Sequence, residues 1–240
     1  MRDFSGIDEK LKRANENIFN LNSEIEGFFK DGEYPVIPEH DRETLLEAIQ
    51  YHKNRFIPPR FSVLSGEIIH HFRSCFDHII WIFSDGPKDN IRKIEFPVFE
   101  RPPNNDSRKL YNGKVHAVAD KRVLAQIDLL QPYNSADPFD DPLLIIHNLD
   151  IVDKHRELVM GFNTGARIFP TAMQPIIEAY ERAHTELDEA HLAEQFKAYG
   201  ILQPFVSFRD FGRRKVQPVP IALMDLFKYT SSVVDAFRVL

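Results

Sequence analysis

Five ionisable or imidazole side chains interrupt one of the most apolar passages of the chain, residues 70–81, which read HHFRSCFDHIIW. Within it, Arg73 could stabilise developing negative charge, and His78 is the residue type that most readily exchanges a proton near neutral pH. Taking an unpaired charge out of water costs several kcal/mol. We therefore expect Arg73, Asp77 and His78 to meet counterions inside the fold or to line a site.

A second polar passage, DKHREL at residues 153–158, could supply those counterions. If the two passages lie on helices that pack together, their opposite charges can satisfy one another without water. The simplest assembly joins Arg73 to Asp153, and Asp77 or His78 to His155 or Arg156. A structural network of this kind and an active or ligand site both remain possible interpretations, because both perturb pKa values.

Apolar periodicity predicts a helix over residues 63–84, closed by a Ser-Asp-Gly-Pro stop. Arg73 and Asp77 are four residues apart and can pair on this helix. His78 is rotated by about 140° from Arg73, so a direct contact between them is not expected. The apolar face comprises Leu64, Ile68, Phe72, Cys75, Ile79 and Ile82, and the polar stripes comprise His70, Arg73, Asp77 and Trp81, with His71, Ser74 and His78 beside them.

A further helix is predicted over residues 141–158, with Asp140 and Asp141 as capping candidates and Pro142 in the first turn. Its apolar line consists of Leu144, Ile151 and Leu158. Asn148 and His155 fall on the same line, so we expect both to find hydrogen bonds inside the protein.

Four motifs in order resemble those of an uncharacterised bacterial family. They read GEIIHHFRSCFDHIIW at 66–81, IEFPVF at 94–99, LQPY at 130–133 and LLIIHNLDIVDKHREL at 143–158. The family shows a run like lHnlRsaLDHL, then FPIF, QPY and NxDKHR, so the resemblance covers roughly residues 60–160. Phe76 replaces a usually smaller aliphatic residue, and segment 176–198 has no counterpart. The resemblance implies no established activity.

The passage RSCFDH at 73–78 is also similar to the R-x4-6-H signature of the HEPN superfamily of helical proteins associated with nucleic acids. Many of these cut RNA without a metal, commonly at a dimer interface. The resemblance implies that Arg73 stabilises the phosphorane, that His78 is general acid or base, and that Asp77 orients one of them. Asp153, His155 and Arg156 join this expected catalytic cluster. RNA and a second copy of the chain are the implied partners.

Several other residues are candidates for ligand binding: His70, Asn148, Lys154, Arg213 and Arg214. The last two belong to FRDFGRRKV at 208–216, where basic groups and aromatics could hold single-stranded RNA, although an ordinary charged hairpin tip fits as well. Glu67 and His70 have the E-x-x-H spacing of di-iron helix bundles. Because further inward-facing carboxylates are missing from that pattern, we expect neither a metal nor a cofactor.

Composition describes an ordinary globular protein, with 240 residues, 43% hydrophobic, and a net charge of −6. Any contact with nucleic acid would therefore need a local basic patch. The lone cysteine, Cys75, excludes an internal disulfide and suits a reducing compartment. The longest wholly apolar run, IIWIF at 79–83, is too short to cross a bilayer, and the N-terminus lacks a signal peptide's apolar region. We expect a cytoplasmic protein without membrane contact.

The remaining patterns predict a helix-rich α+β fold, a helical bundle core with a small antiparallel β-sheet, as a single domain over residues 1–240. The helical core is expected at about 60–160, and a strand–turn–strand unit with a final helix at about 201–240. An apolar stripe over 7–28 could pack on the core or pair with a second copy. Other expected elements are helices at 121–130, 176–198 and 220–239, a short strand in KIEFPVFERPP, and either a helix or a hairpin within 34–60.

Overall fold

The computed structural model describes residues 2–30, 37–38, 56–85, 94–156, 158, 160–167, 201–209 and 216–240. Within these residues the chain is a helix-rich α+β protein with a small sheet, as the sequence predicts. Its contacts group into two compact units, where the sequence suggested a single domain. The larger unit comprises residues 1–24, 58–159 and 208–240, and the smaller comprises 25–57 and 160–207.

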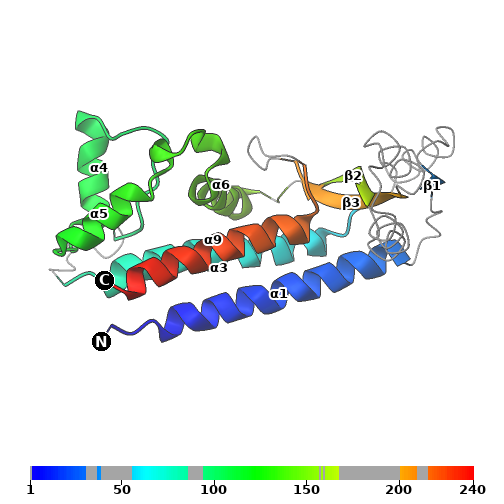
Figure 1. The fold of residues 1–240 in the computed structure, drawn as a ribbon, viewed down its shortest axis with the longest axis horizontal. Coiled ribbons are helices and arrows are strands. Elements are labelled where there is room, and N and C mark those ends of the chain that lie inside the picture. The colour runs from blue at the N-terminus through cyan, green and yellow to red at the C-terminus, as the bar shows by residue number, and fades with distance from the viewer. Residues whose placement is uncertain are drawn as a thin grey trace, which may run out of the picture. The chain divides into compact units, whose positions relative to one another are not determined.

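Three long helices form the centre of the larger unit (Figure 1): α1 (Ser5–Lys30), α3 (Pro59–Ile82) and α9 (Val219–Arg238). Helix α1 runs antiparallel to α3. Its first residues meet the end of α3, where the Phe4 and Phe83 rings lie 6.3 Å apart, and its Glu24 pairs with Arg60 at the start of α3. Helix α9 runs parallel to α3, with Phe227 beside Phe72 and later Phe237 beside Phe83.

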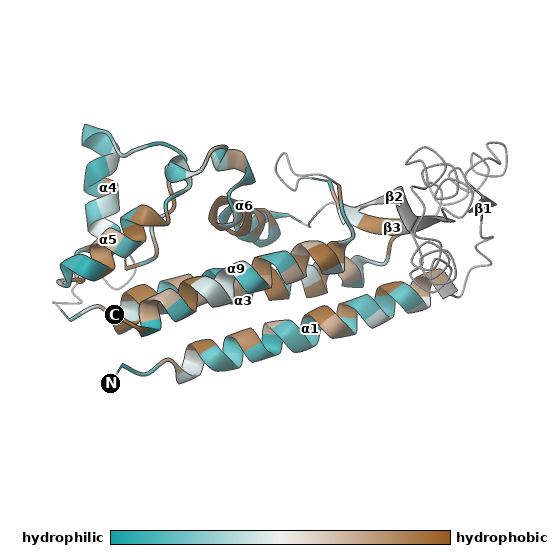
Figure 2. Cartoon of the chain, in the orientation of Figure 1, coloured by the Kyte–Doolittle hydropathy of each residue, from teal (hydrophilic) through white to brown (hydrophobic). Residues whose placement is uncertain are grey.

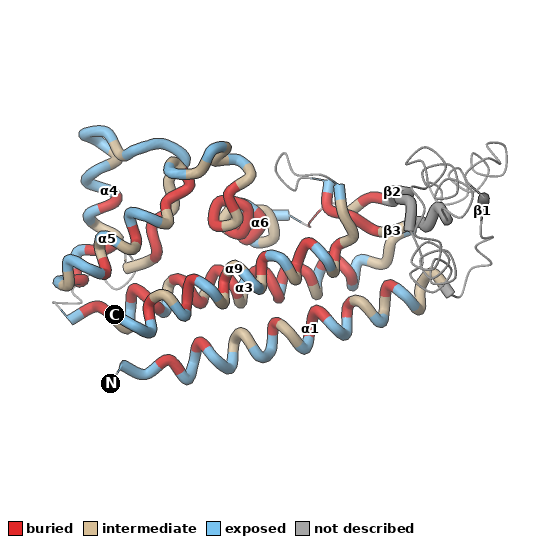
Figure 3. The backbone as a smooth tube through the Cα atoms, viewed as in Figure 1, coloured by how far each residue is buried: buried red, intermediate tan, exposed pale blue. Residues whose placement is uncertain are grey.

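Aromatic side chains fill the space between these helices. Phe72, Phe76, Phe83, Phe96 and Phe237 are all fully buried, and their rings contact one another or the neighbouring Phe and Tyr rings of α9 at 5.4–6.4 Å. Apolar residues follow the buried faces of the helices (Figures 2 and 3). Large aromatic side chains bury more apolar surface than most others, so this cluster contributes much of the stability of the larger unit.

The shorter helices of the larger unit are α4 (Asn105–Val115), α5 (Lys121–Leu129) and α6 (Pro142–His155). Helix α6 packs on α3 and α9. Asp141 caps it by accepting a hydrogen bond from the Leu143 N–H, and Pro142 occupies the first turn, both as predicted. Helix α4, which the sequence analysis did not predict, begins with a capping box between Asn104 and Ser107.

Residues 94–100 form no strand, so that prediction is wrong. The physical reason is that side chains from other elements form hydrogen bonds with the N–H and C=O groups of this segment. The Phe96 N–H donates to Asp77 and its C=O accepts from Arg73. The Pro97 C=O accepts from Gln131 Nε2, and the Phe99 N–H donates to Gln131 Oε1. Because side chains from other elements satisfy these groups, the segment needs no neighbouring strand.

The smaller unit contains a sheet of three strands in the order β1-β3-β2. They are β1 (Ile37–Pro38), β2 (Met160–Arg167) and β3 (Ile201–Phe208), and β1 pairs antiparallel with β3. Strand β3 confirms the first arm of the predicted hairpin, while residues 216–218 are not extended into a strand and 210–215 lie outside the described residues. The helix expected at 176–198 and most of segment 34–60 also lie outside them.

No helix in the described part of the chain combines the length and apolar character needed to span a lipid bilayer.

The stripe on α1 packs on the core of the larger unit, which gives a first prediction. Leu21 is completely buried, whereas Phe19 on the same helix is 60% exposed. Leu21→Ala should lower the free energy of unfolding by about 2–5 kcal/mol, because it leaves a cavity. Phe19→Ala should change it by about 0.5 kcal/mol or less. Urea denaturation measures both, and equal losses would contradict the assigned orientation of α1.

Candidate functional site

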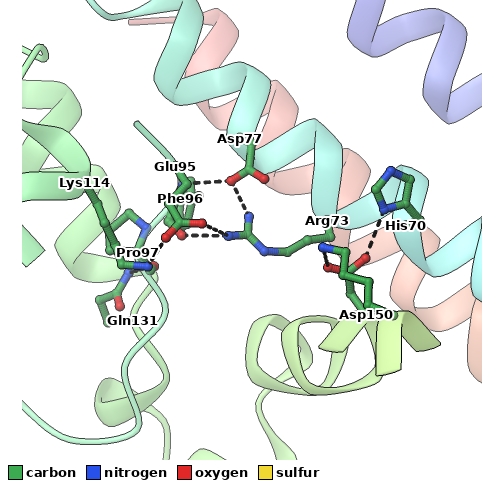
Figure 4. A network of polar contacts seen from close by, with 10 residues as sticks. His70, Arg73, Asp77, Glu95, Phe96, Pro97, Lys114, Gln131 and Asp150 are labelled. Carbon is green, nitrogen blue, oxygen red and sulfur yellow. Dashed lines mark hydrogen bonds and ion pairs between the residues drawn. The ribbon is translucent and has the colours of Figure 1, made fainter. Parts of the chain in front are cut away.

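Arg73 lies almost entirely inside the protein, with 4% of its surface exposed. Its Nη1 donates to Asp77 Oδ1 at 2.6 Å, one turn along α3, which confirms that predicted pair. Its Nη2 donates to the Phe96 carbonyl at 3.0 Å, and a Glu95 carboxylate oxygen lies 3.9 Å away (Figure 4). Three acceptors from two segments thus surround one buried guanidinium.

Asp77 completes this network from the helix side. The same oxygen, Oδ1, that receives the Arg73 bond also accepts from the Phe96 N–H at 2.9 Å. Burial raises the pKa of Asp77, and the charge of Arg73 opposes the shift. Glu95, the second acid of the network, is paired with Lys114 of α4. The network therefore ties α3, segment 94–100 and α4 together through satisfied charges.

The expected pairing of Arg73 with Asp153 is wrong, because Asp77, Glu95 and Phe96 take its donors. His78 does not meet the DKHR passage either. It is exposed and lies toward the N-terminal turn of α1, in a cavity of about 530 Å³ that also contains Asp77 and Trp81. Burial lowers the pKa of His78. Arg73 and His78 thus do not reach a common surface, as their 140° rotation predicts.

Helices α3 and α6 pack together as expected, but the polar residues that join them lie one helical turn before the expected Arg73 and Asp153. The contact is made by His70 Nδ1, which lies 3.0 Å from Asp150 Oδ1 (Figure 4). Lys154 Nζ donates to the other oxygen of Asp150 at 2.5 Å. The Asp150 side chain is 4% exposed, while that of His70 is 55% exposed. A buried carboxylate therefore holds an exposed imidazole and an exposed ammonium.

Asp153, one turn further along α6, lies directly over Gly66 of α3. A Cβ at position 66 would overlap the carboxyl group of Asp153, so a larger residue there would require this carboxyl group to move. Burial and the charge of Asp150 raise the pKa of Asp153. The charges of His70 and Lys154 favour its ionised form without cancelling the effects that disfavour it. The carboxylate of Asp153 is thus held where its ionised form is disfavoured.

An open cavity of about 510 Å³ lies beside these contacts, and we call it the Gly66 cavity. Both of the passages singled out in the sequence contribute to it. Its lining residues are Ser62, Val63, Gly66, Glu67, His70, Asp153, Lys154, His155 and Arg156. The cavity therefore brings His70 of α3 together with four other predicted site residues. These are Asp153, Lys154 and His155 on α6 and Arg156 directly after it.

The orientation expected for the α6 polar residues is wrong in part. Asn148 and His155 are exposed and Ile151 is 41% exposed, so these three positions do not face the core, whereas Leu144 and Leu158 of the same predicted line are buried. The buried face of α6 carries Leu143, Leu144, Ile145, Ile146, Leu149 and Asp150. Asn148 does not line the Gly66 cavity. Arg213 and Arg214 lie outside the described residues.

Glu67 and His70, which line the Gly66 cavity, have the E-x-x-H spacing of a metal site. Among the described residues, no group of three or more His, Cys, Asp or Glu side chains is placed to hold a metal ion. The carboxylate nearest His70, that of Asp150, is occupied by His70 and Lys154. The described geometry therefore gives the di-iron interpretation no support.

Three residues that matter in this region were not among the predicted site residues: Gly66, Glu95 and Asp150. Asp150 carried a usable signal, since it stands four residues before Lys154 and would pair with it on a helix. Gly66 in the middle of a helical pattern was a second signal, because glycine weakens a helix unless a close approach requires it.

Comparison of the chain with protein-family models, with curated proteins and with solved structures finds no match.

The raised pKa of Asp153 predicts how this residue affects stability as the pH changes. Because the folded state disfavours the ionised form, stability is lost as the pH rises above the ordinary pKa of 3.8. Asp153→Asn should therefore be more stable than the wild type at pH 7, and the difference should shrink toward pH 3.5. Urea denaturation at both pH values measures it.

Asp120→Asn is the control of opposite sign for this prediction. Its carboxylate accepts from Arg122, and this bond lowers the pKa of Asp120 to about 2. Stability from this group is present above its unfolded pKa and is lost as the pH falls toward 2, so Asp120→Asn should be the less stable protein at pH 7. An Asp153→Asn variant that is also destabilised at pH 7 would contradict the assigned environment of Asp153.

Proposed function

We propose that the protein binds a small polar ligand in the Gly66 cavity, and that the Arg73 network is structural. The observation that carries the proposal is the contrast between the two polar clusters. Arg73 is sealed and fully engaged with acceptors, whereas His70, Lys154, His155 and Arg156 are exposed around an open cavity. Convergent polar groups at a concave site are the usual sign of ligand binding.

The charges around the cavity favour a neutral or zwitterionic ligand. Its lining contains two carboxylates, Glu67 and Asp153, and two permanent cations, Lys154 and Arg156. These formal charges cancel when the histidines are neutral. A polyanion would meet two repulsive groups there, while a ligand carrying both a donor-rich and an acceptor-rich end could use all four.

The contact between Asp153 and Gly66 supports a functional role for the cavity. A half-buried carboxylate whose ionisation is disfavoured reduces stability at neutral pH, and an asparagine would avoid the loss. Groups held at such a cost cluster at binding and catalytic sites.

RNA binding, or metal-independent RNA cleavage, is the second candidate. It is favoured by the three consecutive basic residues Lys154, His155 and Arg156 beside the exposed His70. In an RNA-cleaving protein of this kind, Arg156 and not Arg73 would stabilise the phosphorane, because the donors of Arg73 are engaged inside the protein. A cytoplasmic location and a homodimer belong to the proposal as well.

A blocking substitution tests the proposed site. Val63 lines the cavity and is 53% exposed, so Val63→Trp should fill the cavity without disturbing the core. Ile221→Trp on α9 is the matched control, because Ile221 is equally exposed and lies elsewhere. A thermal-shift screen would cover neutral, zwitterionic and anionic small molecules and a short single-stranded RNA.

We expect neutral or zwitterionic compounds to raise the melting temperature of the wild type and of Ile221→Trp, but not of Val63→Trp. Stabilisation by RNA instead, again lost in Val63→Trp, would establish the second candidate. Compounds that stabilise Val63→Trp as strongly as the wild type bind elsewhere, and that outcome would refute the site.

A further inference from the structure

His70 and Asp150 have the geometry of an acid–base dyad rather than of a simple ion pair. Asp150 is buried and its Oδ1 lies 3.0 Å from His70 Nδ1. Because a carboxylate only accepts hydrogen bonds, this contact places the proton on Nδ1 and leaves the lone pair on Nε2. The ring is 55% exposed and lines the Gly66 cavity, so a ligand there can reach it.

We propose that the Gly66 cavity hydrolyses a small carboxylic ester, with His70 as general base and Asp150 as the residue that positions it. The proposal rests on the proposed function, because the substrate is the ligand that the cavity binds. Hydrolysis of the bound ester is then a chemical step that follows binding.

Asp150 is equipped to hold the imidazole in one orientation. Its second oxygen accepts from Lys154, so both oxygens are engaged and the carboxylate is oriented from two sides. The Lys154 ammonium also places a positive charge beside this carboxylate. A charged Asp150 in turn stabilises the imidazolium that His70 becomes during the reaction.

Water is the nucleophile that this site can use. The hydroxyl of Ser62, which lines the cavity, donates to the Leu158 carbonyl. Cys75 is completely buried, and burial raises the pKa of its thiol to about 12. Neither side chain can therefore serve as an activated nucleophile for a substrate in the cavity.

The step balances without a cofactor. The oxygen of water forms a bond to the carbonyl carbon while His70 Nε2 takes one of its protons, and the carbonyl electron pair moves onto oxygen. Arg156 lines the cavity outside the His70–Asp150 dyad, and its guanidinium can stabilise this oxyanion. The C=O bond re-forms, the C–O bond to the alcohol breaks, and the alcohol oxygen takes the proton from His70.

The pH dependence follows from the same step. Hydrolysis needs the lone pair of His70 Nε2 as the proton acceptor, so the rate should depend on pH. The charged or titratable groups around it are Glu67 and His71 on α3, Asp150, Asp153, Lys154 and His155 on α6, and Arg156 at the end of α6. Asp150→Asn should alter the profile, because an asparagine amide cannot fix the same tautomer.

Hydrolysis of p-nitrophenyl acetate and of bis(p-nitrophenyl) phosphate by the full chain tests the inference. We expect saturable hydrolysis of the acetate, a decrease in kcat of about 100-fold or more in His70→Ala, and partial rescue of that variant by added imidazole. His78→Ala is the matched control, since His78 is an exposed histidine of the same helix in a different cavity, and its rate should equal that of the wild type.

The outcomes separate the inference from the binding proposal. A wild-type rate no higher than that of His70→Ala, or equal losses in His70→Ala and His78→Ala, would overturn the catalytic role. Ligand-induced stabilisation that Val63→Trp abolishes would then still stand as binding without catalysis. Faster cleavage of the phosphate diester than of the acetate would overturn the assigned substrate class. Circular dichroism of each variant shows whether a loss of rate reflects unfolding.

Discussion

The buried guanidinium of Arg73 is the constraint on which the larger unit depends. It cannot be left without acceptors in the interior, and the structure supplies them from Asp77 on its own helix and from the backbone of Phe96. The ring of Phe96 packs against Phe76 and Phe237, so the ion pair and the aromatic core fix the same segment. Polar satisfaction and apolar packing therefore reinforce one another, and segment 94–100 keeps a defined conformation without being a strand.

Helix α3 divides its polar residues between two tasks along its length. Arg73, in its second half, is buried beneath segment 94–100, and it holds the fold together with its half-buried partner Asp77. Gly66, Glu67 and His70, in its first half, face the end of α6 across an open cavity. Enclosed charges rigidify a structure, whereas exposed charges around a cavity remain available to a ligand. This division explains why polar motifs that look alike in the sequence have different environments.

The sequence was sufficient to predict helices α1, α3, α5, α6 and α9, the Asp141 cap of α6, the Arg73–Asp77 pair and the packing of α3 on α6, because these follow from local spacing and apolar periodicity. Helix α4 was missed. It was not sufficient to predict the partners between helices. One turn of offset replaces an Arg73–Asp153 contact by the His70–Asp150 contact, and periodicity does not fix that offset. Nor could it show that Asn148 and His155 face solvent. They share a line on the helix with the apolar Ile151, which predicts a buried face, yet Ile151 is itself partly exposed. The acceptor role of the Phe96 backbone has no sequence signature.

A double-mutant cycle between Arg73 and Asp77 tests the central claim most directly, using Arg73→Met, Asp77→Ala and the double variant in urea denaturation. Each single change should cost about 3–5 kcal/mol, because it leaves a buried charge or its acceptors unpaired. The double variant should be less destabilised than the sum by at least about 1 kcal/mol. The exposed Arg122–Asp120 pair, treated in the same way, should show a much weaker coupling, because solvent screens both charges. Additive losses at Arg73 and Asp77 within about 0.5 kcal/mol would contradict the account.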